Sequence, residues 1–175
     1  MSKRIILWSG ISVVVASFVL WLFWTGEEDR IQDQFDELSV LGSKTGDASP
    51  LSDALVLKEF ANLFSANVVF KTGGRERLAG EYTDRELVER YGRIRVLAKR
   101  LELRFDEIEF LSIQDTEATV TVQVLAEGTD KGGNRYSENF RVEVLLRKSE
   151  GDWKFSQFTY LDSSTSKHAP SIFRR

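Results

Sequence analysis

The side chains of this chain that could carry acid–base chemistry are few. The protein has no cysteine, which excludes thiol nucleophiles, disulfides and thiolate metal sites. Its single histidine, His168, lies in a Ser- and Thr-bearing C-terminal segment, so we do not expect a zinc site built from histidines. The candidates that remain for proton transfer, or for polar contacts in a pocket, are tyrosines and carboxylates: Tyr82, Tyr91, Tyr136, Tyr160, Asp106 and Glu107.

Each of these candidates also has an ordinary structural explanation. A tyrosine beside apolar strand residues usually lies at the edge of a core, and an isolated carboxylate is usually solvated. General acid–base catalysis needs a positioned pair of groups, and no motif in the sequence specifies such a pair. We therefore predict no catalytic residue, no metal and no cofactor, and we regard the tyrosines as weak candidates for the lining of a pocket.

The charge of the chain argues against one class of partner. The formal net charge is −3 at pH 7, so a general nucleic-acid binder is not expected. Acidic residues dominate 25–66, whereas arginines and lysines cluster in 85–100. Two solvated helix faces are the ordinary explanation of such clusters. The alternative is that the two faces meet, within one chain or between two chains.

An apolar run at residues 5–24 contains no charge and no proline. As a helix it is about 30 Å long, which matches the hydrocarbon core of a bilayer. Ile5 begins the run, and Trp8, Trp21 and Trp24 occupy the places of an interfacial aromatic belt. A cleavable signal peptide has a shorter apolar region and a small-x-small cleavage site. A retained membrane anchor is therefore the favoured prediction, and cleavage is the alternative.

The charges that flank this run predict its orientation. Lys3 and Arg4 precede it and three acids follow it, so the N-terminus is expected in the cytoplasm. The rest of the chain would then lie in the periplasm or another extracytoplasmic space, attached to the inner cell membrane. The absence of cysteine suits such an oxidising compartment. The expected partners are the membrane, an envelope protein and a second copy of the chain.

Apolar spacing beyond the run predicts three helices. The first covers 27–41, and the second begins at Pro50 behind the N-cap Ser49 and extends to about residue 66. The third begins after Thr83, which forms a capping box with Glu86, and its apolar stripe continues to about residue 101.

A change of apolar period from 3.6 to 2 then predicts strands. The expected segments are a short strand at 68–70, before the third helix, and four long antiparallel strands within 101–113, 119–124, 136–148 and 153–160. The apolar parity shifts near Asp106, which predicts a bulge there, and Glu150 and Gly151 predict a tight hairpin. Helices segregated from strands indicate an α+β fold, with three helices on a curved antiparallel sheet that bends around the third helix.

The element order, and a last strand introduced by Glu-Gly-Asp-Trp-Lys-Phe at 150–155, resemble the nuclear transport factor 2-like superfamily, which includes SnoaL-like and ketosteroid isomerase-like domains. The resemblance covers about 27–161 and implies a cone-shaped domain. It divides the chain into a cytoplasmic tip with an anchor (1–26), the cone domain (27–161) and a polar tail (162–175). An anchor before such a domain also resembles envelope assembly proteins.

The superfamily contains both enzymes and non-catalytic binding domains, so the fold alone does not select a function. Isomerase-like members use an aspartate base with a tyrosine or a protonated acid, and dehydratase-like members rely on histidine with aspartate. The chain departs from both patterns, because its histidine lies outside the domain and its inward strand faces carry valine and phenylalanine.

The predicted function is therefore a membrane-anchored, extracytoplasmic binding or assembly module without catalysis. The alternatives are an isomerase- or dehydratase-like enzyme, or a binder of an apolar small ligand such as a lipid, acting in the cone. A dimer is expected through the anchor or through the exposed sheet face that carries Arg141, Glu143 and Arg147.

Overall fold

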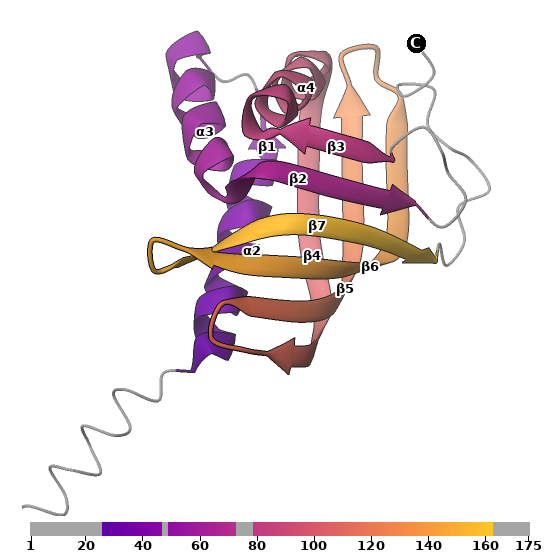
Figure 1. The fold of residues 1–175 in the computed structure, drawn as a ribbon. Coiled ribbons are helices and arrows are strands. Elements are labelled where there is room, and N and C mark those ends of the chain that lie inside the picture. Colours follow the sequence, from indigo (N-terminus) through magenta and orange to yellow (C-terminus); the bar gives the residue numbers. More distant parts are fainter. Residues whose placement is uncertain (1–25, 47–48, 73–78, 163–175) are drawn as a thin grey trace, which may run out of the picture.

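The computed structural model describes residues 26–46, 49–72 and 79–162 (Figure 1). Within them the elements are α2 (Glu27–Gly42), β1 (Lys44–Thr45), α3 (Pro50–Asn62), β2 (Phe64–Thr72), β3 (Gly80–Thr83), α4 (Asp84–Leu97), β4 (Ala98–Ile113), β5 (Glu117–Asp130), β6 (Arg135–Ser149) and β7 (Asp152–Asp162). The predicted anchor, with Ile5, Trp8, Trp21 and Trp24, and the histidine of the tail lie outside the described residues. No helix of the described part is long and apolar enough to span a membrane.

All strands belong to one sheet, in the order β1-β4-β5-β6-β7-β2-β3. Neighbouring strands are antiparallel except β2 and β7, which run parallel. The α+β prediction is confirmed, but the sheet is mixed rather than purely antiparallel. Figure 1 shows β7, β2 and β3 crossing in front of the long strands, so that the sheet bends into a concave surface with the helices along one side.

Helix α2 fills the narrow part of this concave surface. Ile31 and Phe35 are fully buried, and the Phe35 ring lies 5.3 Å from the ring of Phe105 on β4 and 5.1 Å from that of Phe155 on β7. The prediction that the sheet bends around the third helix is therefore wrong. Helix α4 cannot take that place, because its buried position is occupied by Arg95 and its Leu97 is 57% exposed.

Two predicted helix ends are also wrong, and strand pairing explains both. Helix α3 ends at Asn62 rather than near residue 66, because Phe64 already pairs with Phe155 of β7. Helix α4 ends at Leu97 rather than near residue 101, because Ala98 begins the long pairing of β4 with β5. Tertiary pairing overrides a local apolar period in both places.

Local turn and cap signals are confirmed. The Ser49 hydroxyl accepts a hydrogen bond from the Ser52 amide at 3.2 Å, and the capping box at the start of α4 is formed on both sides. The register of β4 shifts after Asp106, where Glu107 adopts a φ of 51°. A positive φ at Glu150, and another at the glycine that follows it, close the hairpin between β6 and β7.

Candidate functional site

Burial falls steadily along the concave face of β5 and β6. Val120 and Val122 of β5 and Val144 of β6 are fully buried, whereas the same face further along both strands is only half-buried. We call this half-buried region the outer end of the concave face; its residues are Ala126, Gly128, Tyr136, Glu138, Phe140 and Tyr160. The strand alternation that carries the valines into the core carries these residues onto the same side.

Half-buried aromatic rings gather beside the outer end, and we call them the aromatic wall. The rings of Phe140 and Tyr160 stack at 5.7 Å, and those of Phe70 and Phe158 stack at 5.2 Å. Tyr82 meets Phe70 edge-on at 5.7 Å. This aromatic wall therefore runs from β6 across β7 and β2 to β3, with apolar ring surface that the core does not fully cover.

Two polar side chains of β6 lie opposite two small residues at the outer end of β5. In the β5–β6 register, Glu138 faces Ala126 and Tyr136 faces Gly128. The Tyr136 ring covers the glycine so closely that a Cβ there would lie 2.0 Å from the phenol oxygen. Neither polar side chain makes a hydrogen bond or an ion pair in the described part of the chain. Small residues and polar side chains without a partner in the described part of the chain therefore occur together at the outer end.

The electrostatic surroundings keep Tyr136 protonated. Burial raises the pKa of its phenol, and the nearby charge of Asp130 raises it further. Hydrogen bonds from the side chain (2.8 Å) and backbone (2.9 Å) of Asn134 lower the pKa of Asp130, so this carboxylate stays charged at neutral pH. Tyr136 is consequently a neutral hydrogen-bond donor at physiological pH.

Tyr91 is engaged in a buried polar network instead. Its hydroxyl donates to the Leu41 carbonyl at 2.7 Å and accepts from Arg95 Nη1 at 2.8 Å. Burial raises the pKa of Tyr91, and the hydrogen bond from Arg95 opposes that change. The ring stacks on Phe60 at 4.2 Å. With its hydroxyl and one ring face in use, Tyr91 ties α4 to α2 and α3.

Arg95 is the centre of this network and is only 4% exposed. Its guanidinium contacts Asp53 Oδ1 of α3 at 2.8 and 3.0 Å and donates to the Ser43 carbonyl at 2.9 Å. Burial alone would lower the pKa of Arg95, but the hydrogen bonds with Tyr91 and Asp53 outweigh it and raise the pKa. Beside it, Lys44 Nζ donates to the carbonyls of Arg95 and Ala98 at the end of α4.

The structure thus separates the residues that the sequence singled out. Tyr82, Tyr136 and Tyr160 lie along the outer end and its aromatic wall, whereas Tyr91 belongs to the network behind it. Asp106 and Glu107 are exposed at the β4 bulge and do not join either group. Sequence reasoning missed Glu138, although the alternation of 136–148 places it on the same face as Phe140 and Val142.

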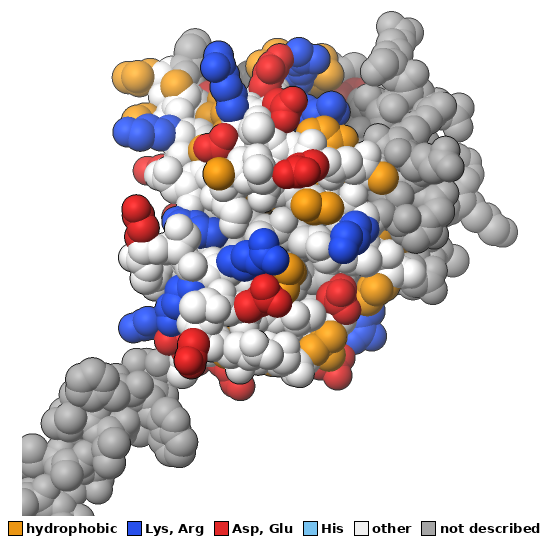
Figure 2. Space-filling model, in the orientation of Figure 1, with side chains coloured by type: hydrophobic (Ala, Val, Ile, Leu, Met, Phe, Trp, Pro, Cys, Tyr) orange, Lys and Arg blue, Asp and Glu red, His pale blue; other side chains and the backbone are white. Residues whose placement is uncertain are grey.

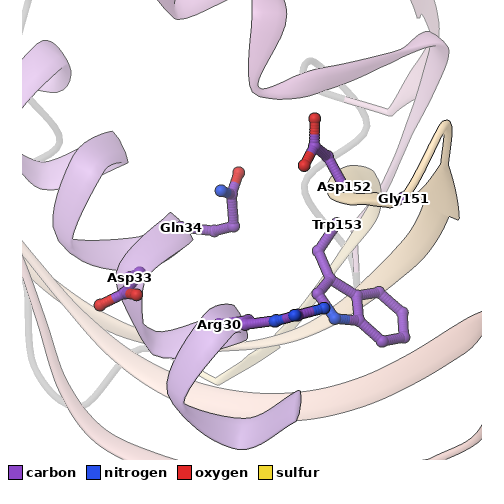
Figure 3. A pocket seen from close by; sticks show the side chains of 6 residues that line it. All are labelled: Arg30, Asp33, Gln34, Gly151, Asp152 and Trp153. Carbon is purple, nitrogen blue, oxygen red and sulfur yellow. The ribbon is translucent and has the colours of Figure 1, made fainter. Parts of the chain in front are cut away.

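A surface hollow of about 410 Å³ lies elsewhere, between the start of α2 and the β6–β7 hairpin (Figure 3). Arg30 extends from α2 toward Trp153 in this view. The Trp153 indole N–H donates to Glu27 Oε2 at 2.7 Å, and Lys148 Nζ donates to Glu27 Oε1 at 2.8 Å. These hydrogen bonds lower the pKa of Glu27. Glu27 thereby holds the first turn of α2 to Lys148 and Trp153 of the sheet.

The face drawn in Figure 2 carries acidic and basic side chains in close mixture. The acidic and basic helix segments meet at one buried pair, Asp53 with Arg95, while Arg93 pairs with Glu89 on its own helix. The possibility that opposite charges meet within one chain therefore holds for that buried pair. In the described residues, no group of three or more His, Cys, Asp or Glu side chains could hold a metal ion.

Comparison with solved structures identifies the fold. A proposed aromatic ring hydroxylase from Novosphingobium aromaticivorans aligns with a TM-score of 0.66 at 14% identity, covering 83% of this chain and 94% of its own. A proposed scytalone dehydratase from the same organism aligns with a TM-score of 0.59 at 17% identity, covering 82% and 89%. The chain has the nuclear transport factor 2-like fold.

A third similar structure is a hexachlorocyclohexane dehydrochlorinase from Novosphingobium barchaimii, with a TM-score of 0.59, 12% identity, and coverage of 79% of this chain and 87% of its own. At these identities the likeness establishes the cone-shaped architecture and no shared activity. No protein-family model and no curated protein sequence matches the chain.

Proposed function

We propose that the chain binds an apolar, aromatic-sized small molecule at the outer end of its concave face. The observation that carries this proposal is the half-buried aromatic wall next to two small residues, Ala126 and Gly128, on a strand whose other end is fully buried. Small-molecule sites are mostly apolar and aromatic, with a few polar groups that orient the ligand. The outer end has this composition, and the prediction of a non-catalytic assembly module does not account for it.

The test introduces a large side chain at the proposed binding site and, for comparison, at a position in the packed core. Ala126 and Ala118 lie on the same face of β5, but Ala118 is fully buried. Ala118→Phe should destabilise the domain by at least about 1–3 kcal/mol, the usual cost of overpacking a core. Ala126→Phe should leave the unfolding temperature within a few degrees of wild type and should abolish saturable binding of 2-methylnaphthalene, measured by probe fluorescence.

Equal destabilisation by the two substitutions would mean that the outer end is packed like the core, and the proposal would fail. Absence of saturable 2-methylnaphthalene binding to the wild-type chain would also overturn it.

A second candidate is an enzyme of the elimination or isomerisation type at the same place. The activities named for the dehydrochlorinase and for the proposed dehydratase favour it. Such chemistry needs a base and a hydrogen-bond donor, and Glu138 with Tyr136 are the groups on β6 that would supply them. The test is deuterium incorporation at the carbon next to the carbonyl of 2-tetralone in D₂O. Rates equal to those of buffer alone would exclude this candidate for that substrate class.

We also propose, from the sequence, that residues 5–24 tether the domain to the inner membrane with the domain outside the cytoplasm. Alkaline extraction of membranes tests the tether, because a spanning helix stays with the lipid. A dimer through the sheet face of Arg141, Glu143 and Arg147 is a separate proposal. Analytical ultracentrifugation at two salt concentrations tests it, since exposed charge contacts are screened by salt.

A further inference from the structure

We propose that Tyr136 and Glu138 make the outer end selective for aromatic ligands that carry a hydroxyl group. This inference rests on the proposed function and specifies its ligand. A hydroxyl group can accept a hydrogen bond from a phenol while donating one to a carboxylate. The two residues are two positions apart on β6, so both side chains lie on the concave face, with Cα atoms about 7 Å apart.

The polar groups of Tyr136 and Glu138 are not engaged with other described parts of the protein. Buried polar side chains normally find hydrogen-bond partners within the protein, and half-buried ones that lack such partners are open to water or to a ligand. Tyr136 and Glu138 are both half-buried, yet neither makes a hydrogen bond or an ion pair in the described residues. Glu143, half-buried on the opposite face of the same strand, likewise has no partner in the described residues, so what distinguishes Tyr136 and Glu138 is their place on the concave face beside the aromatic wall.

The glycine of β5 determines how closely the tyrosine lies to the strand. Gly128 lies opposite Tyr136, and its missing Cβ is what allows the phenol to lie across the strand. The glycine does not have a positive φ, so backbone conformation does not require it there. Its role is the close approach of the phenol. Tyr136 thereby points its donor over the concave face instead of toward solvent beyond the strand.

The two polar side chains are chemically complementary to a hydroxyl group. Tyr136 keeps its proton in this environment and donates, while Glu138 offers carboxyl oxygens that accept. Asp130 and Tyr91 also act electrostatically on Tyr136, and both are already hydrogen-bonded within the protein. The aromatic wall supplies stacking surface for the ring of the ligand. An aromatic hydrocarbon would leave both polar groups unsatisfied, and an aromatic ether would satisfy only the phenol.

Three probes of one size separate these contributions: 2-naphthol, 2-methoxynaphthalene and 2-methylnaphthalene. Binding of each to the full chain is followed by probe fluorescence. Wild type should bind 2-naphthol at least tenfold more tightly than 2-methylnaphthalene, with the ether between them, since each hydrogen bond contributes about a fivefold gain or more. Tyr136→Phe should weaken the naphthol and the ether about fivefold and leave the hydrocarbon unchanged.

Glu138→Met should weaken only the naphthol, and Gly128→Ala should reproduce the loss caused by Tyr136→Phe by displacing the ring. Glu143→Met is the matched control and should change no ratio. Because the readout is a ratio between probes on the same protein, a partly unfolded preparation does not alter it. Equal wild-type affinities, or a naphthol-to-methylnaphthalene ratio unaffected by Tyr136→Phe, would overturn the inference while leaving the proposed function standing. Failure of all three probes to bind saturably would overturn both.

Discussion

The buried ion pair between Asp53 and Arg95 gives the sharpest prediction about stability. The Arg95 side chain is 5% exposed and that of Asp53 is 23% exposed. Asp53→Ala leaves a buried guanidinium without its only carboxylate partner among the described residues. Removing one partner of a buried ion pair lowers the free energy of unfolding by about 3–5 kcal/mol. Because water reaches Asp53, we expect about 3 kcal/mol, the lower end of this range. For a domain of this size, that loss lowers the unfolding temperature by about 10 °C.

The assay is thermal and urea unfolding of the full chain, followed by circular dichroism. Arg95→Met should also destabilise, because it leaves the carbonyl of Ser43 and the hydroxyl of Tyr91 without their donor. The destabilisation of the double variant should be smaller than the summed destabilisations of the two single variants, by about 1–3 kcal/mol. Each single change leaves the remaining charged partner buried without its counter-charge.

The matched control is the exposed pair of Arg93 with Glu89 on the same helix. Glu89→Ala should cost about 0.5 kcal/mol or less, because exposed pairs contribute little. An Asp53→Ala variant within about 1 kcal/mol of wild type, or strict additivity of Asp53→Ala with Arg95→Met, would refute the reasoning that α3 and α4 are joined by a desolvated ion pair.

Two further predictions concern the ends of α2. The folded-state pKa of Glu27 is lowered, so its stabilising contribution is present above the usual pKa of 4.5 and is lost as the pH falls below that value. The difference in unfolding temperature between wild type and Glu27→Gln should therefore shrink from pH 7 to pH 3. A Glu28→Gln control should show little difference from wild type at either pH. Gly42→Ala should destabilise by about 1–3 kcal/mol, because the added Cβ would lie 2.6 Å from Leu103 Cδ2. Gly92→Ala, where the nearest atom is 3.4 Å away, should be neutral or stabilising by up to about 1 kcal/mol; similar effects at both glycines would contradict the packing described.

Local signals in the sequence carry over to the structure where a few neighbouring residues decide the outcome. The capping box at Thr83 and the hairpin at Glu150 each depend on hydrogen bonds or backbone angles within four residues. The alternation of valines along β5 likewise identifies its buried face. The α+β class follows from these elements, because their order along the chain leaves few ways of packing them.

Long-range packing explains what the sequence did not predict. Both α2 and α4 carry apolar stripes, and only the closed sheet shows that α2 occupies the concave face. Arg95 is indistinguishable from its exposed neighbours until Asp53 and two backbone carbonyls from distant segments surround it. The short strands β1 and β3 exist through pairing with other strands, so periodicity within four residues or fewer cannot reveal them.

The candidate site was only partly predictable for the same reason. Tyr82, Tyr136 and Tyr160 stood out by residue type, but nothing local indicated that Gly128 faces Tyr136 across the β5–β6 pair. Glu138 was accessible through strand parity, yet its position among uncovered aromatic rings depends on the register of four strands. Side chains that share a surface from different strands become a site only when that register is known.

The central claim is that an aromatic ligand occupies the outer end of the concave face, and NMR titration of the full chain with 2-naphthol tests it most directly. The account predicts saturable chemical-shift changes concentrated on Ala126, Phe140 and Tyr160. Shifts concentrated instead on the exposed Leu51 and Leu55 of α3, or changes that never saturate, would contradict it.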